Sequence, residues 1–148
     1  MAQIRCKWVD GLQFIGSDAD RHSVVLDASA EGGKGEGLGF RPAQMLLVGL
    51  GSCTGMDVIS ILQKQRQEVH TFEVDVSGEQ AADPPWPFVR IHVEYVIKGR
   101  GIDKAAVERA ISLSETRYCS VWATLRARAE ITSSYRIEES AASRPIPA

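Results

Sequence analysis

Two cysteines, Cys53 and Cys119, are the residues of this 148-residue chain whose types and spacing point to joint chemistry. Cys53 lies in a small-residue, apolar stretch, and Cys119 follows far along the chain in Ser114–Val121. A count of three cysteines is odd and too small for a disulfide scaffold. In a reducing compartment such thiols are more often catalytic, redox-sensing or metal-binding. The layout therefore suits two-cysteine redox chemistry, in which one thiol closes onto the other. By residue type alone, a buried cysteine with a purely structural role is the commoner case.

The element that must hold Cys53 is a long helix, which we expect over residues 42–66. Pro42 suits the first helical position, where its missing N–H is not needed. Lys64 and Arg66 are favourably placed near the carboxyl end. Apolar residues recur between these ends at helical spacing, namely Met45, Val48, Met56, Ile59 and Leu62.

Three glycines, Gly49, Gly51 and Gly55, interrupt this predicted helix. Each costs about 0.8–1 kcal/mol relative to alanine, and close backbone approach is the usual compensation. The approaching partner could be a helix of the same chain or the symmetry mate, and the simpler alternative is a core helix kinked at the glycines. Because one small chain cannot easily cover a long apolar helix on all sides, we expect a homodimer with this helix in or beside the interface.

The remaining elements alternate in a way that predicts an α+β fold with antiparallel sheets around the central helix. Asp10-Gly11 is a hairpin signal, and Asp103 is a candidate N-cap. Strands are expected at 4–9, 12–15 and 22–26 before the helix, and at 71–77, 88–97 and 130–137 after it, with further helices at 104–114 and 119–128. We therefore expect a single domain over residues 1–138 and a loose tail over 139–148.

Charge and hydropathy exclude several classes of function. Lys and Arg number 17 against 19 Asp and Glu, so no nucleic-acid partner is expected. The N-terminus has no apolar signal-peptide core, which favours a cytoplasmic protein. Residues 45–62 reach the minimum length of a membrane span, and Gly51-x-x-x-Gly55 resembles a transmembrane dimer motif. Asp57 and several hydroxyl residues lower the hydrophobicity of residues 45–62, so we expect no membrane association.

The sequence neighbours of Cys53 do not activate its thiol, so any activating group must come from a distant part of the chain. The thiol would lie about three turns inside the helix, beyond the reach of the N-terminal dipole. A reactive thiolate therefore needs a cation from elsewhere, and the candidates are Arg21, Arg41, Arg117 and Arg126. A metal site could recruit His70 and His92 beside the thiols, but no C-x-x-C or H-E-x-x-H spacing is present, so we expect neither metal nor cofactor.

Two segments resemble the OsmC/Ohr family, named after osmotically inducible protein C and the organic hydroperoxide resistance protein. One is the helix Arg41–Val58, in which a cysteine stands eleven residues after a proline, and the other is Tyr118-Cys119-Ser120-Val121. The match runs from about residue 8 to residue 137. Both motifs are closer to the uncharacterised OsmC-like branch than to the best-studied peroxidases.

The resemblance implies an intertwined homodimer and a thiol peroxidase that reduces organic hydroperoxides. Cys53 would attack the peroxide, Cys119 would resolve the product as a disulfide, and a dithiol reductant would reopen it. The peroxidases carry a glutamate just after the helix-starting proline, where this chain has Ala43 and Gln44. This difference supports an alternative, namely a non-enzymatic OsmC-like dimer that binds a small hydrophobic molecule or senses redox state.

Overall fold

The computed structural model describes residues 1–141, and the chain divides into two compact units, Met1–Leu46 and the part from Leu47 onward. The elements follow the predicted order β-β-β-α-β-β-α-α-β, with one added π-helical turn. The expected α+β fold class is therefore confirmed.

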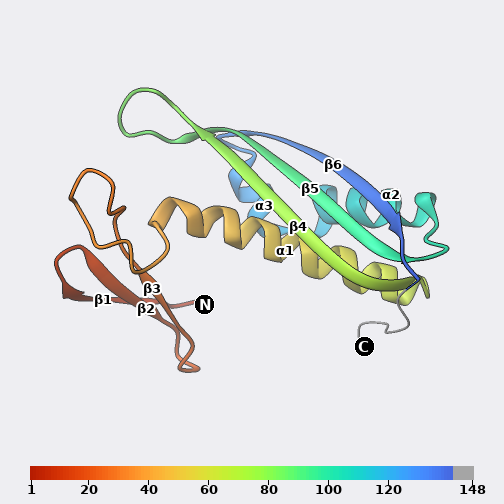
Figure 1. The fold of residues 1–148 in the computed structure, drawn as a ribbon, viewed down its shortest axis with the longest axis horizontal. Coiled ribbons are helices and arrows are strands. Elements are labelled where there is room, and N and C mark those ends of the chain that lie inside the picture. The colour runs from red at the N-terminus through yellow and green to blue at the C-terminus, as the bar shows by residue number, and fades with distance from the viewer. Residues whose placement is uncertain (142–148) are drawn as a thin grey trace. The chain divides into compact units, whose positions relative to one another are not determined.

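The first unit contains a three-stranded antiparallel sheet (Figure 1). Its strands are β1 (Arg5–Asp10), β2 (Gln13–Ser17) and β3 (Ser23–Leu26). The predicted hairpin at Asp10-Gly11 is confirmed: Gly11 has φ +49°, and its N–H donates to the Asp10 carboxylate at 2.8 Å. Glycine suits this position because a left-handed φ costs it nothing.

The helix α1 spans Pro42–Lys64, two residues shorter than expected at its carboxyl end. At its start the Gln44 side-chain oxygen accepts the backbone N–H of Arg41 at 3.0 Å, which is half of a capping box. Beyond its end Arg66 has φ +58°, a conformation that does not continue a right-handed helix.

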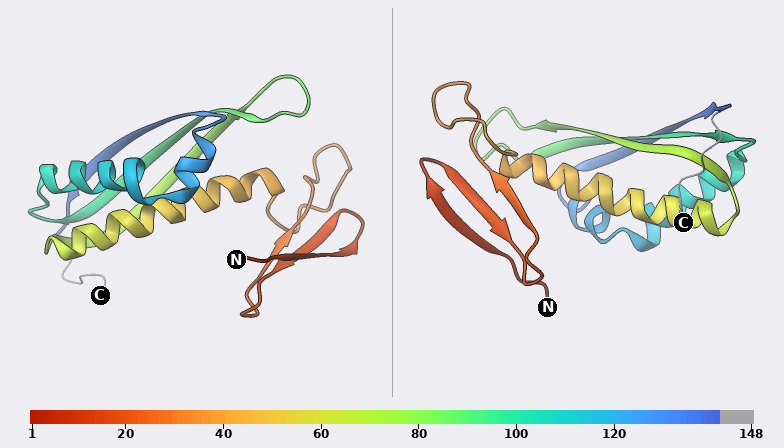
Figure 2. Two further views of the ribbon diagram at one scale, coloured as in Figure 1. Left: turned by 180° about the vertical axis from the view of Figure 1, so that it is seen from behind. Right: turned by 60° about the horizontal axis from the view of Figure 1, so that its bottom comes forward.

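The second unit is a three-stranded sheet with helices on one face (Figures 1 and 2). Its strands are β4 (Glu68–Gln80), β5 (Phe88–Arg100) and β6 (Glu130–Glu139), all longer than the sequence predicted. β4 pairs antiparallel with β5, but β5 pairs parallel with β6, so the expectation of antiparallel sheets is wrong for this pair. The crossover that the parallel pair requires is α2 (Lys104–Leu113), the π-helical turn η1 (Ser114–Tyr118) and α3 (Ser120–Leu125). Asp103 caps α2 as predicted, because its carboxylate accepts the Ala105 N–H at 3.1 Å.

Because β6 extends to Glu139, the first residue of the expected tail is part of a strand. Residues 142–148 of that expected tail lie outside the described part of the chain.

The core of the second unit lies between its sheet and its helices. Strand β5 contributes the alternating residues of one face, and the helices contribute the opposite wall. The buried side chains include Ile91, Val93, Tyr95 and Ile97 from β5, Leu50, Val58 and Leu62 from α1, Val107 and Ile111 from α2, and Trp122 from α3.

The glycines of α1 allow the helix to approach strand β4. A Cβ atom on Gly51 would lie 2.9 Å from Val76 Cγ2, and one on Gly55 would lie 3.3 Å from Val74 Cγ2. The expectation that these glycines face another helix or a symmetry mate is therefore wrong: their neighbour is a strand of the same chain. A Cβ atom on Gly49 would meet nothing within 4 Å.

This packing also accounts for the apolar length of α1. By length and a mean hydropathy of 1.8 the helix is suitable for a membrane span. Its residues Leu50, Thr54, Val58 and Leu62 are nevertheless fully buried inside the second unit. These contacts are those of a core helix.

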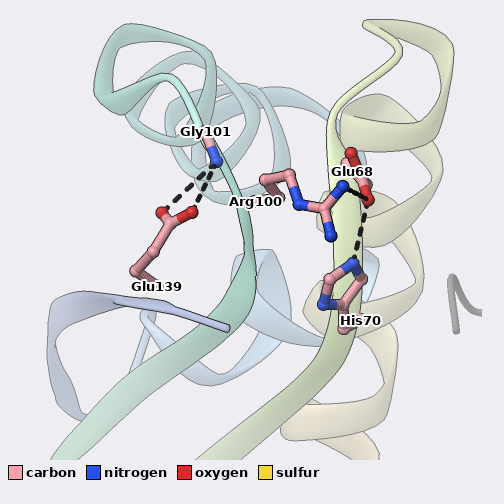
Figure 3. Close-up of polar contacts among 5 residues, drawn as sticks. All are labelled: Glu68, His70, Arg100, Gly101 and Glu139. Carbon is pink, nitrogen blue, oxygen red and sulfur yellow. Dashed lines mark hydrogen bonds and ion pairs between the residues drawn. The ribbon is translucent and has the colours of Figure 1, made fainter. Parts of the chain in front are cut away.

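A β-bulge at His70 shapes the end of β4 beside α1. Val69 pairs with Gly99 and Thr71 with Lys98, so His70 is the extra residue. Figure 3 shows the contacts there: the buried His70 ring lies 3.2 Å from the Glu68 carboxylate, which also lies 3.7 Å from Arg100. These contacts give His70 a local structural partner.

We expect opposite effects when the two neighbouring helical glycines are substituted. Gly49→Ala should raise the free energy of unfolding by about 0.8–1 kcal/mol, because it adds helix propensity without a clash. Gly51→Val should lower it by about 1–3 kcal/mol, because its side chain overpacks against β4. Urea unfolding of both variants checks this, and a shift of both in the same direction would contradict the assignment.

Candidate functional site

The structure brings the two predicted thiols together. The sulfur atoms of Cys53 and Cys119 and a carboxylate oxygen of Asp57 all lie within 4.8 Å of one another. Cys53 and Asp57 share one face of α1 because they are four residues apart. Cys119 reaches them from the junction of η1 and α3. The whole cluster lies within the second unit.

The π-helical turn places Cys119 at this junction. The Cys119 N–H donates to the Ser114 carbonyl, five residues earlier, at 2.9 Å, which is the bond that defines a π turn. Cys119 then becomes extended, with φ −73° and ψ 104°, and its sulfur accepts the Trp122 N–H at 3.3 Å. Its sulfur is thereby fixed at the start of α3, and the residue is only 3% exposed.

The two thiols lie in unequal environments. Burial, and after it the neighbouring Cys53 thiol, raise the pKa of Cys119 from 9.0 to about 12, against a smaller opposing effect of the Trp122 N–H. Cys119 is therefore a protonated thiol at neutral pH. Cys53 is only half-buried, although it packs against the core.

A chain of buried hydroxyl groups lies next to the thiols. Thr54 Oγ1 lies 2.7 Å from the Tyr95 hydroxyl and 2.8 Å from Ser114 Oγ, and Ser114 donates to Asp57 Oδ2 at 2.9 Å. Thr54, Tyr95 and Ser114 have no exposed surface. Burial raises the pKa of Tyr95 well above its ordinary value, so the phenol is a neutral donor.

The donor directions in this chain follow from the proton count. A carboxylate only accepts, so the single Ser114 proton goes to Asp57. Ser114 must then accept from Thr54, and Thr54 must accept from Tyr95. All three hydroxyl groups therefore point toward Asp57, and the chain holds one carboxylate oxygen in place.

Asp57 has no cationic partner among residues 47–141. None of the ion pairs in that part of the chain includes Asp57, Arg117 or Arg126. Arg117 instead lies over the Tyr118 ring, 5.8 Å from its centroid. The other two arginine candidates, Arg21 and Arg41, belong to the first unit. Within the described residues of the second unit, therefore, no ion pair joins a cation to the carboxylate beside the thiols.

The histidines considered beside the thiols have other positions. His70 lies at the β-bulge (Figure 3). His92, on β5, lies 2.8 Å from both Thr132 and Ser134 on β6. Neither belongs to the group of ligand atoms that surrounds Cys53.

Sequence reasoning missed three members of this site, Thr54, Tyr95 and Ser114. The spacing of Cys53 and Asp57 did indicate that these two are neighbours, since residues four apart share a helix face, but it did not assign Asp57 to the site. Tyr95 and Ser114 come from a strand and a distant turn, so no local pattern indicated them.

The raised pKa of Cys119 gives a pH dependence with a definite sign. The folded state keeps this thiol proton up to about pH 12, whereas the unfolded chain loses it near 9.0, so stability falls as pH rises through that window. In Cys119→Ala this contribution is absent, and the fall should be shallower. Urea unfolding in reductant from about pH 8 to about pH 10 measures it. Cys6→Ala, which removes an exposed thiol, should keep the wild-type slope, and equal slopes for all three proteins would contradict the assignment.

Comparison with known proteins places this chain in a family. The family model described as OsmC-like protein matches residues 33–134. Protein YhfA of Escherichia coli K12 is 39% identical over 135 residues, which cover 91% of this chain and 97% of that protein.

Solved structures agree with this match. A hypothetical protein from Aquifex aeolicus VF5 has 26% identity and a TM-score of 0.82, over 95% of this chain and 98% of its own. The organic hydroperoxide resistance protein OhrB of Bacillus subtilis shares the fold at 16% identity and a TM-score of 0.60, over 92% of this chain and 98% of its own. The resemblance seen in the sequence is thus confirmed, and the chain belongs to the OsmC-like family.

Proposed function

We propose that this protein is a thiol-dependent peroxidase that reduces organic hydroperoxides with Cys53 and Cys119. The observation that carries the proposal is the approach of the two sulfur atoms to within 4.8 Å. Neighbouring elements need only small movements to bring such sulfurs to the bond length of a disulfide, about 2.05 Å. The fold shared with OhrB, an organic hydroperoxide resistance protein, supports the substrate class.

The reaction would proceed in three steps. The Cys53 sulfur attacks the O–O bond, and the products are a sulfenic acid on Cys53 and the alcohol. The Cys119 sulfur then attacks the Cys53 sulfur, a disulfide forms, and the sulfenic oxygen leaves as water with the Cys119 proton. A dithiol reductant restores both thiols by exchange and is itself oxidised to a disulfide.

The unequal environments of the thiols support this division of roles. Cys53 is the more accessible thiol, so a peroxide can reach it first. Cys119 is buried and its pKa is raised to about 12, so it stays protonated until an electrophilic sulfur forms beside it. Asp57 adjoins both sulfurs, where it can accept a proton.

The surroundings of Cys53 favour an alkyl hydroperoxide over hydrogen peroxide. Cys53 packs against the core of the second unit, near the fully buried Leu50 on the same helix.

Gln44, which replaces the family glutamate, is used to cap α1 at Arg41. Because the Asp57 carboxylate beside Cys53 has no ion-pair partner among the described residues of the second unit, it disfavours the thiolate, and we expect slow turnover.

We further propose that the protein is a soluble, cytoplasmic homodimer. Both faces of the first-unit sheet expose apolar side chains, which is unusual for a monomer. The exposed apolar residues of its strands are Trp8, Val9, Phe14, Ile15 and Val25, and Leu12, Leu38 and Phe40 are exposed in the connecting segments. On α1, Met56 is also 70% exposed. A second copy of the chain would cover surface of this kind.

A second candidate function is the binding of a small hydrophobic molecule. An apolar groove of about 390 Å³ lies in the first unit, on the sheet face that carries Cys6, Val24 and Leu26, with Ile4 and Met45 at its sides. Co-purified ligand in native mass spectrometry, together with thiols that do not react with peroxide, would favour this function over the peroxidase.

The peroxidase proposal predicts a characteristic mass change. One equivalent of cumene hydroperoxide should lower the intact mass of the reduced protein by about two daltons, as two thiols become a disulfide. In Cys119→Ser the sulfenic acid on Cys53 should be trapped by a dimedone-type reagent, and Cys53→Ser should show neither change. Chelator is present throughout, and Cys6→Ser is the matched control. An unchanged mass in the wild type would contradict the proposal.

The dimer proposal predicts a solution mass of twice 16.2 kDa by light scattering. Ile15 and Val25 are paired neighbours on β2 and β3, and both are partly exposed. Changing both to glutamate should shift the protein toward the monomer, because charged groups are costly in an apolar interface. Glu73→Lys, an exposed change on β4, should leave the mass unchanged, and a monomeric wild type would overturn the proposal.

A further inference from the structure

The peroxidase proposal uses Asp57 only as a proton acceptor beside the thiols. This half-buried carboxylate adjoins two thiols and has no cationic partner among residues 47–141. Its carboxylate accepts a hydrogen bond from Ser114. Partly buried charges in proteins are normally paired or coordinate a metal. A carboxylate beside two sulfur donors is stabilised by a bound cation.

We infer that Cys53, Cys119 and Asp57 form a binding site for a thiophilic divalent cation, with zinc as the best fit. Zinc takes thiolate sulfur at about 2.3 Å and carboxylate oxygen at about 2.0–2.2 Å in tetrahedral geometry. Ligand atoms around such an ion lie roughly 3.5–3.8 Å apart. The three donor atoms here already lie within 4.8 Å of one another, so small side-chain rotations close the site.

The groups behind the donors resemble the outer shell of a metal site. Ligating carboxylates and sulfurs are usually held by further hydrogen bonds, which fix their orientation. Here Ser114 holds one Asp57 oxygen, and Thr54 and Tyr95 hold Ser114 in turn. The Trp122 N–H does the same for the Cys119 sulfur. A solvated surface carboxylate would need no such buried support.

The charges and donor types also suit zinc. Two thiolates and one carboxylate carry a charge of −3, which a divalent cation reduces to −1. Sulfur donors select zinc over magnesium or calcium, which prefer oxygen ligands. Three protein ligands leave the fourth tetrahedral position for water or a small molecule.

The site escaped sequence analysis because its donors have no motif spacing. Cys53 and Asp57 come from one helix turn, and the third ligand follows more than sixty residues later. The expectation of no metal rested on the absence of C-x-x-C and H-E-x-x-H patterns, and those patterns report only ligands that are close in sequence.

Binding converts two thiols to thiolates and releases their protons, so the affinity should rise with pH. The inference does not depend on the proposed peroxidase activity. A bound zinc ion and a Cys53–Cys119 disulfide exclude each other, because both use the same sulfurs. Zinc would therefore protect the pair from peroxide while it is bound.

The test is a metal titration of reduced, chelator-treated protein. Zinc, in competition with a chromophoric chelator, should bind at one equivalent per chain with micromolar or tighter affinity. Cobalt(II) should give the ultraviolet thiolate-to-cobalt charge-transfer band of sulfur ligation. Cys53→Ser and Cys119→Ser should each lose that affinity, and Ser114→Ala should weaken it about tenfold through its support of Asp57.

Asp57 variants make the assignment specific. Asp57→Asn should weaken zinc binding by at least about tenfold to a hundredfold, whereas Asp57→His, which supplies a nitrogen ligand, should keep it. Asp75→Asn, an exposed carboxylate change on β4, should bind as the wild type does. Absence of stoichiometric zinc binding, a cobalt spectrum without the sulfur band, or wild-type affinity in Asp57→Asn would each overturn the inference. The peroxide experiment is run in chelator, so its failure leaves the zinc result unaffected.

Discussion

The close contact between α1 and strand β4 is the constraint on which the rest of the second unit depends. It exists because Gly51 and Gly55 present no side chain to Val76 and Val74. Thr54 shares that helix face and is therefore buried in the core, where its hydroxyl is hydrogen-bonded to Tyr95 on β5. With larger residues at the two glycines, the helix would stand off from the sheet and this hydrogen bond could not form.

The same packing determines the chemistry beside Cys53. A threonine in a core needs hydrogen-bond partners, and here Tyr95 and Ser114 supply them. Tyr95 is itself held by a parallel stack with Phe72, with ring centroids 6.4 Å apart. Because Ser114 must then give its proton to Asp57, the buried network ends on a carboxylate beside two thiols. A structural requirement of the core thus positions the charged group of the site.

This member of the OsmC-like family differs from the peroxidase pattern in how its thiols are surrounded. In that pattern a glutamate stands just after the helix-starting proline. The structure gives Gln44 a capping role at Arg41 and gives the thiols a neighbouring carboxylate instead. A carboxylate next to a cysteine pair can serve proton transfer during thiol oxidation or act as a third metal ligand. The two chemistries require the same reduced thiols.

Local periodicity and turn chemistry were enough to predict the order of the elements, the helix that carries Cys53, the hairpin at Gly11 and the cap at Asp103 from the sequence. The sequence also identified the family through the two cysteine motifs. The predicted strands were too short. Hydrogen-bonded pairing of β4 with β5 continues beyond the residues in which apolar and polar side chains alternate most clearly.

Only the tertiary structure decided what the glycines face and what surrounds the thiols. Gly51 meets β4, and Cys119 meets Cys53 and Asp57 through a π turn that no sequence pattern indicated. The physical reason is the same in each case. Periodicity tells which face of an element is buried, but the identity of the atoms opposite that face depends on how distant segments pack.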